Sequence, residues 1–150
     1  MNKARRCLLG VLVTGVASLA AGCQAPGSAR NAPRDGVFVH ITRGADDPHA
    51  VLMGLKMATL MAADRDVLVY FDLKGVEVVL ADAPDLRYDG FESSRVQLRT
   101  LLDRGVPVLV CPGCLRAAGR TAEDVLPRVQ VADKERFFSF TRGRILTLDY

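Results

Sequence analysis

The chain has 150 residues, of which 20 are lysine or arginine and 17 are aspartate or glutamate, giving a formal net charge of +3 at pH 7. Residues 1–22 hold three of the basic residues and none of the acidic ones, so residues 23–150 carry no formal net charge. This balance argues against nucleic-acid binding, which needs a basic surplus to neutralise phosphates. The ~128 remaining residues are enough for one domain with a hydrophobic core.

The N-terminus has the pattern of a lipoprotein export signal. Lys3, Arg5 and Arg6 precede an uncharged apolar stretch over residues 7–21, and small residues lead up to Cys23. A basic start, a short apolar core and a small-residue cleavage site are typical of export signals. The apolar run is shorter than the ~20 residues of a membrane span. We expect cleavage after residue 22 and acylation of Cys23, with an uncut signal anchor or an ordinary secretory signal as the alternatives.

This signal predicts a protein of the cell envelope that is anchored to the membrane by lipid and faces the periplasm. Gln24 follows the acylated cysteine, and an aspartate there would favour retention in the inner membrane, so the outer membrane is the default expectation. Residues 24–35 are Ala, Pro, Gly, Ser, Asn and Arg in large part, without an apolar period. We therefore expect a flexible tether over 23–35 and a single domain over 36–150.

Short β-rich runs alternate with helical segments from residue 36 onward. Asp47 and Pro48 form a helix start, and Asp133 caps a later helix. In chain order we predict a strand over 37–42, a helix over 48–63, a strand over 67–72, a short β segment over 75–80, a helix over 91–104 capped by Ser93 or Ser94, a strand over 106–110, a helix from 112 to 118, a helical turn at 121–124, a brief strand over 129–132, a helix over 134–140 and a strand over 145–148.

Strands rich in Val, Leu and Ile that are separated by helices indicate a mainly parallel sheet covered on both faces. With right-handed crossovers, the pattern predicts an α/β fold: a three-layer α/β/α sandwich with about five strands and a flavodoxin-like layout. Such sheets bind ligands beyond the carboxyl ends of their strands. Three predicted loops lie at that edge, over residues 42–48, 72–75 and 111–114.

Cys111 and Cys114 are the strongest functional candidates. They are the only cysteines left once Cys7 leaves with the signal and Cys23 is acylated, and an oxidising compartment would let them pair. If Cys111 is an N-cap followed by Pro112, free backbone N–H groups and the helix dipole lower the thiol pKa values. We expect redox or sulfur-transfer chemistry, with Cys114 favoured as the nucleophile because it lies inside the first helical turn. The alternative is a structural disulfide or two unreactive thiols.

Neither a resident cofactor nor a metal site is predicted. Zinc needs about four ligands, and the chain has no second C-x-x-C motif. His40 on a predicted strand and His49 at a helix start are expected to be structural. Asp46 and Asp47 are adjacent carboxylates that fit a loop and a helix cap better than an acid–base pair.

A methionine row lies along the first predicted helix. Met53, Met57 and Met61 have i, i+4, i+8 spacing, which raises Cu(I) as a ligand because thioethers bind it well. The helix is apolar nearly all round, however, with Lys56 the only charge between residues 49 and 64, so it should be buried on both sides. We expect one side to pack on the sheet and the other, with Met53, Leu60 and Met61, to meet a second subunit.

Four segments together carry a resemblance to a known family. They are residues 39–42 (VHIT), residues 47–49 (DPH) at the start of an apolar helix, residues 69–76 (VYFDLKGV), and residues 110–115 (VCPGCL) with Gly119. In order and spacing they resemble the DsrE/DsrF-like family over roughly residues 36–150. The resemblance implies an α/β domain that forms trimers or hexamers. It also implies relatives that carry sulfur as a persulfide on a cysteine, in cytoplasmic relays that lack a lipoprotein signal.

The sequence therefore predicts an envelope-anchored protein that handles sulfane sulfur, or exchanges thiols and disulfides, through Cys111 and Cys114. It leaves open whether the protein is an enzyme, such as a sulfurtransferase, and which substrate and partner it has. The alternative is a non-catalytic oligomeric binding module of the envelope, with a soft metal such as Cu(I) as a candidate ligand.

Overall fold

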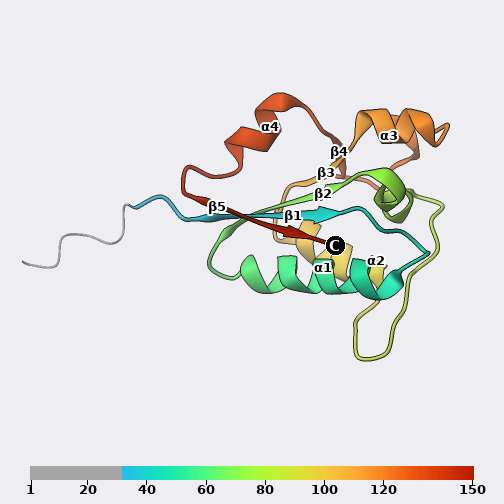
Figure 1. Cartoon of the computed structure of the whole chain (residues 1–150), viewed down its shortest axis with the longest axis horizontal. Helices are drawn as coiled ribbons and strands as arrows, with labels where there is room; N and C mark the ends of the chain where they lie inside the picture. Colours follow the sequence, from blue (N-terminus) through green and yellow to red (C-terminus); the bar gives the residue numbers. More distant parts are fainter. Residues whose placement is uncertain (1–31) are drawn as a thin grey trace, which may run out of the picture. The chain divides into compact units, whose positions relative to one another are not determined.

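A five-stranded parallel sheet forms the centre of the domain (Figure 1). The structure is a computed structural model and describes residues 32–150, so the predicted signal, Cys23 and most of the tether lie outside the described residues. The strands are β1 (Gly36–Ile41), β2 (Asp66–Phe71), β3 (Val108–Val110), β4 (Gln130–Val131) and β5 (Ile145–Asp149). Their order across the sheet is β4-β3-β2-β1-β5, and all four neighbouring pairs are parallel, which confirms the predicted sheet.

Helices cover both faces of this sheet. Within residues 32–150 they are α1 (Pro48–Met61), α2 (Ser94–Asp103), α3 (Pro112–Ala117) and α4 (Lys134–Ser139), with 3-10 helices η2 (Leu73–Val79) and η3 (Ala122–Asp124). Figure 1 draws α1 and α2 below the sheet and α3 and α4 above it, which gives the three layers of the predicted α/β fold. None of these described helices combines the length and the apolar character that crossing a membrane requires.

Successive side chains of each strand point to opposite faces of the sheet, and the two faces are packed differently. Toward α1 and α2, strand residues such as Val39 and Phe71 meet helix residues such as Leu55 and Leu101 in a large, fully buried aliphatic core. The face toward α4 has a much smaller cluster with aromatic rings around it: Leu68, Leu109, Ala132, Phe38, Tyr70, Phe137 and Phe140. One face is thus sealed by two long helices, and the other is thinly covered.

Helix α1 begins where the sequence predicts. Asp47 is its N-cap and accepts a hydrogen bond from the backbone N–H of Ala50 at 3.0 Å, while Pro48 takes the first helical position. Leu55 is buried against the sheet, whereas Leu60 is 54% exposed. The outward side of α1 is therefore not fully covered within one chain, and the subunit interface expected around Leu60 stays a prediction.

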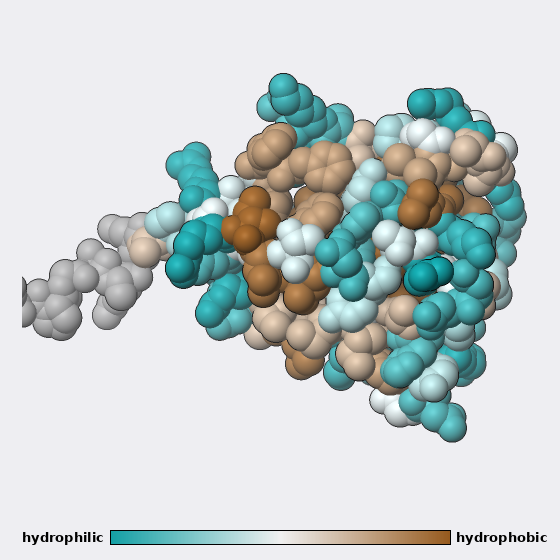
Figure 2. All heavy atoms as spheres, in the orientation of Figure 1, coloured by the Kyte–Doolittle hydropathy of each residue, from teal (hydrophilic) through white to brown (hydrophobic). Residues whose placement is uncertain are grey.

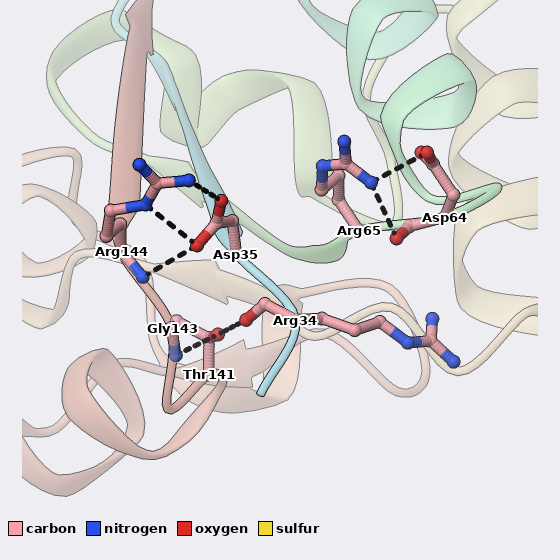
Figure 3. A network of polar contacts seen from close by, with 7 residues as sticks. All are labelled: Arg34, Asp35, Asp64, Arg65, Thr141, Gly143 and Arg144. Atoms are coloured by element: carbon pink, nitrogen blue, oxygen red, sulfur yellow. Dashed lines mark hydrogen bonds and ion pairs between the residues drawn. The ribbon is translucent and has the colours of Figure 1, made fainter. Parts of the chain in front are cut away.

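A polar network holds the start of β5 against the start of β1 (Figure 3). Asp35, just before β1, accepts hydrogen bonds from the Nη2 of Arg144 at 2.6 Å and from its backbone N–H at 3.1 Å. These bonds hold the pKa of the Asp35 carboxyl below its usual range. The hydroxyl of Thr141 donates to the Arg34 carbonyl at 2.8 Å. The last strand is thereby fixed beside the first, although more than a hundred residues separate them.

The predicted β segment over 75–80 is wrong, because most of that run forms the 3-10 helix η2. Its valines, including Val76 and Val79, are buried, so their apolar character reflects burial and not strand pairing. Both sides of β2 are already occupied by β1 and β3, and the chain must turn away from the sheet. The N–H of Gly75 closes this turn by donating to the Asp72 carbonyl at 2.7 Å. Only Leu80 keeps a strand-like contact, an isolated bridge.

The helix predicted over 91–104 starts at Ser94, three residues late. Ser93 occupies the N-cap position, but its side chain makes no capping hydrogen bond. The hydroxyl of Ser94 instead accepts from the N–H of Leu86 at 2.9 Å and ties the preceding loop to the helix. Phe91 contacts the core from this loop, which is why its apolar character extended the predicted helix.

Substitution of Gly75 tests how closely η2 packs against the end of β1. A Cβ atom added there would overlap the backbone carbonyl oxygen of Ile41, which cannot move without disturbing the sheet. Gly75→Ala should lower the free energy of unfolding by about 1–3 kcal/mol in urea titrations followed by circular dichroism. Gly113→Ala is the control, since its new Cβ would meet only Cys111 Sγ at 3.7 Å, and it should change stability by less than about 0.5 kcal/mol. Equal unfolding midpoints for the two variants would contradict this packing.

Candidate functional site

Cys111 lies where β3 ends and α3 begins, as the sequence predicts. It is the N-cap of α3, and Pro112 takes the first helical position. Its Sγ accepts a hydrogen bond from the backbone N–H of Cys114 at 3.3 Å. The strand thus delivers the sulfur to the carboxyl edge of the sheet, and the helix start supplies an N–H donor that the helix itself leaves unused.

The loop after β2 supports the second thiol. The backbone N–H of Leu73 donates to the Sγ of Cys114 at 3.2 Å. Leu73 has a φ of 45°, in the left-handed region that non-glycine residues seldom adopt, and its side chain is exposed. Two of the three predicted edge loops, 72–75 and 111–114, therefore meet at the cysteine pair. Neither sulfur is bonded to another cysteine in this structure.

A histidine between two carboxylates lies on the α4 side of the same edge. The Nε2 of His40 is 2.9 Å from Asp72 Oδ1, and its Nδ1 is 2.9 Å from Asp149 Oδ1. Burial lowers the pKa of His40, but the two carboxylates outweigh it and raise the pKa overall. From the sequence we expected His40 to be structural. The structure places it next to Tyr70 in the sheet, with the two rings stacked 5.6 Å apart.

Tyr70 connects this histidine to the cysteine pair. It neighbours His40 on β1 and Leu109 on β3, two residues before Cys111. Burial, followed by the interaction with the Cys111 thiol, raises the pKa of the tyrosine far enough to keep it protonated at any physiological pH. Tyr70 therefore keeps an O–H group beside the Cys111 sulfur. Sequence reasoning missed it, although alternate positions on adjacent parallel strands could have placed it on this face.

The two thiols differ in acidity. Burial raises the pKa of Cys111, but hydrogen bonds from Tyr70 and from the backbone N–H groups of Cys114 and Gly113 outweigh it, so the pKa is lowered overall. Burial and the hydrogen bond with Cys111 raise the pKa of Cys114, and the N–H of Leu73 offsets this only in part. The arrangement stabilises one thiolate, on Cys111, next to one neutral thiol.

A cavity of about 660 Å³ opens beside Cys111, between α4 and the thinly covered face of the sheet. Cys114 is not among the residues that line it. Figure 2 shows apolar residues gathered around this hollow, over α4 and the start of β5. The lining consists of Phe38, Tyr70, Cys111, Pro112, Ala132, Asp133, Lys134, Phe137, Phe138, Phe140 and Ile145.

The other sequence candidates lie apart from this site. His49 stacks on Tyr88 with ring centroids 4.3 Å apart. Asp47 caps α1 and Asp46 pairs with Lys74 at 2.9 Å, which confirms their expected cap and loop roles. Within residues 32–150 no three His, Cys, Asp or Glu side chains are grouped to hold a metal ion. The methionine row lies on α1, across the sheet from α4 (Figure 1).

Comparison with known proteins agrees with this architecture. The model of the DsrE/DsrF-like family matches residues 35–141. The crystal structure of the ychN protein from E. coli superposes with a TM-score of 0.58 at 13% identity, covering 77% of this chain and 98% of that one. A protein of unknown function from Methanobacterium thermoautotrophicum, MTH1491, superposes with a TM-score of 0.53 at 22% identity, covering 77% and 99%. At these identities both likenesses concern the fold. The search of curated proteins found no match.

The His40 ion pairs predict a specific pH dependence of stability. Because the pKa of His40 is raised above its ordinary 6.5 in the folded protein, charged His40 stabilises the fold fully below that value. This contribution is lost as pH rises through the folded-state pKa. The difference in unfolding free energy between wild type and His40→Asn should therefore be largest below about pH 6.5 and shrink as the pH rises above it in urea titrations.

His49→Asn is the matched control, because His49 forms no ion pair among residues 32–150 and lies against Tyr88. Its stability difference from wild type reports lost stacking. If the His40→Asn difference were constant over the same pH range, the imidazole would not be held by Asp72 and Asp149 as described.

Proposed function

Because this chain belongs to the DsrE/DsrF-like family, we propose that it handles sulfane sulfur, with Cys111 as the acceptor thiolate and Cys114 as the second thiol. One observation carries this assignment. The Cys111 sulfur accepts a hydrogen bond from the first turn of α3, Tyr70 contributes to lowering its pKa, and it lines a cavity of ligand size. A stabilised thiolate with access to a ligand is what attack on sulfur requires.

The first step is a thiolate displacement. The Cys111 thiolate attacks the outer sulfur of a persulfide donor, R–S–SH. A new S–S bond forms at Cys111, the donor S–S bond breaks, and the electron pair leaves on R–S⁻, which takes a proton from water. Cys111 then carries the persulfide, and no external oxidant or reductant is needed. Tyr70, which stays protonated, keeps an O–H group beside this sulfur.

Two routes complete the cycle. In sulfur transfer, an acceptor thiolate takes the outer sulfur and Cys111 leaves as thiolate. In the second route, Cys114 attacks the inner sulfur, forms the Cys111–Cys114 disulfide and releases hydrosulfide, and a dithiol reductant then restores both thiols. The same pair exchanges with disulfides by the same displacement. From the sequence we favoured Cys114 as the nucleophile, but the lowered pKa of Cys111 and the raised pKa of Cys114 favour Cys111.

The alternative of a soft-metal binding module has less support. Two thiolates could bind Cu(I), but the methionines that first raised this ligand lie on α1, beyond the opposite face of the sheet. We also propose a homo-oligomer, trimeric or hexameric as the family resemblance implies. The partly uncovered outer side of α1 around Leu60 supports it as an interface.

Alkylation kinetics test the thiolate assignment. The rate of iodoacetamide reaction against pH should show an inflection well below the ~8.5 of a free cysteine. Tyr70→Phe keeps the ring but removes the O–H donor, so the inflection should move up. Cys114→Ser should keep a low inflection, and Cys111→Ser should abolish it. After exposure to polysulfide, the Cys114→Ser variant should gain about 32 Da, one sulfur, at Cys111.

The same experiment can refute the proposal. If neither thiol titrates below the free-cysteine value, and neither takes up sulfur nor exchanges with a disulfide, the pair is structural. The oligomeric binding module would then be the better description of the protein.

We further propose export and lipid anchoring at Cys23, with the domain facing the periplasm and the outer membrane as destination. The basic start, the apolar core and the small residues before Cys23 support this proposal. Cys23→Ser should yield a protein without an acyl group that leaves the membrane fraction, as measured by mass spectrometry and fractionation. A Cys23→Ser protein that stayed in the membrane fraction without lipid would contradict it and favour an uncut signal anchor.

A further inference from the structure

The cavity beside Cys111 has the size and the lining of a binding site for a small organic molecule. Its volume of about 660 Å³ lies within the range of roughly 300–1,000 Å³ that small-molecule sites span. Five of the eleven residues that line it carry aromatic rings: Phe38, Tyr70, Phe137, Phe138 and Phe140. Within this lining the rings of Tyr70 and Phe137 meet edge-on, with centroids 4.9 Å apart. Such walls favour a flat, apolar guest.

The reactive sulfur belongs to the wall of this cavity. Cys111 and Pro112 line it, whereas Cys114 does not. A donor whose organic body sits among the rings would therefore present its sulfur to Cys111 and not to Cys114. The body would remain in the cavity as the leaving thiolate after displacement.

Charge in and around the cavity disfavours a small inorganic donor. Lys134 is the one cationic residue in the lining. Asp133, also in the lining, caps α4 by accepting from the N–H of Arg136 at 2.9 Å. The carboxylates of Asp72 and Asp149 flank His40 in the sheet next to Tyr70. Polysulfide and thiosulfate are dianions and would gain little among aromatic walls that offer one cation.

We propose that this cavity recognises the organic body of the sulfur donor, so that the preferred substrates are persulfides and disulfides of apolar, aromatic thiols. This inference rests on the proposed function, because it names the substrate class of the same thiol. The rim of the cavity is open on the α4 side, where the side chain of Phe138 is 73% exposed and that of Ile145 is 50% exposed. A guest there would cover apolar surface that the single chain leaves in water.

Disulfide exchange gives a direct measurement on the purified mature protein. The aromatic probe is 4,4′-dithiodipyridine, and the aliphatic probe is 2-hydroxyethyl disulfide. In each case the Cys111 thiolate forms a mixed disulfide and the other half of the probe leaves as thiolate. Each rate is divided by the rate of N-acetylcysteine with the same probe, which removes the intrinsic reactivity of the disulfide. We expect the aromatic probe to saturate with concentration and to be favoured by at least about tenfold, the effect of ~1.4 kcal/mol of binding.

Matched variants locate the preference. Phe138→Ser removes a ring from the cavity rim and should reduce the aromatic preference about five- to tenfold, which corresponds to the energy of an aromatic contact. Leu146→Ser is the control, because Leu146 is similarly exposed (55%) but lies outside this cavity. It should leave the preference unchanged. Both residues are surface residues, and the alkylation rate of Cys111 by iodoacetamide checks that each variant keeps an intact site.

A binding measurement separates this inference from the proposed function. In Cys111→Ser, saturation-transfer NMR should still detect 4,4′-dithiodipyridine on the protein, and Phe138→Ser in that background should weaken the signal. If Cys111 takes up sulfur but shows no aromatic preference, the cavity proposal fails and the proposed function stands. If Phe138→Ser changes the molecular mass in light scattering without changing the preference, a second copy covers this face and the proposal is overturned. If the aromatic probe binds and no thiol reacts, the cavity binds organic molecules but the sulfur function fails, and with it the substrate assignment.

Discussion

The in-register parallel pairing of β1, β2 and β3 is the constraint on which the rest of the site depends. Because all strands run the same way, their carboxyl ends lie at one edge, and because side chains alternate, every second residue reaches the same face. His40 and Tyr70 are paired across β1 and β2, and Tyr70 is paired with Leu109 across β2 and β3. Cys111 is two residues beyond Leu109, on the same face. A one-residue slip of β3 would turn its sulfur into the opposite layer.

The unequal covering of the two faces separates stability from function. The face of the sheet that packs on α1 and α2 buries long aliphatic side chains completely, and it supplies most of the apolar burial in the described domain. The other face is covered by α4, a helix of six residues, and keeps a hollow lined by rings. A site on a thinly covered face costs the fold little, because its aromatic residues contribute less to the main core.

Helix starts and strands could be predicted from local sequence patterns, whereas contacts between segments far apart in the chain could not. Two helix starts could each be predicted from two residues, Asp47 before Pro48 and Cys111 before Pro112. Both are confirmed. The run of valines after Gly75 was misread, because burial in a 3-10 helix and burial in a strand give the same apolar pattern over seven residues. The contact of His40 with Asp149 could not be predicted from the sequence. It requires β5 to pair with β1, and the sequence pattern of an edge strand does not indicate which strand it pairs with. The cavity depends in the same way on where α4 rests.

The cysteine pair also shows why residue spacing alone does not choose a nucleophile. Both sulfurs lie at the start of α3, where spacing makes them nearly equivalent. Their difference comes from elements outside the motif: Tyr70 on β2 helps to lower the pKa of Cys111, while Leu73, at the start of η2, donates its N–H to Cys114. Because the two thiols interact, a proton removed from one raises the cost of removing the second, so the pair titrates as a unit and Cys111 loses its proton first. The strand β2 and the turn after it thus set the two sulfurs apart, because Tyr70 favours the charged form of Cys111 and the turn holds Cys114 through the N–H of Leu73.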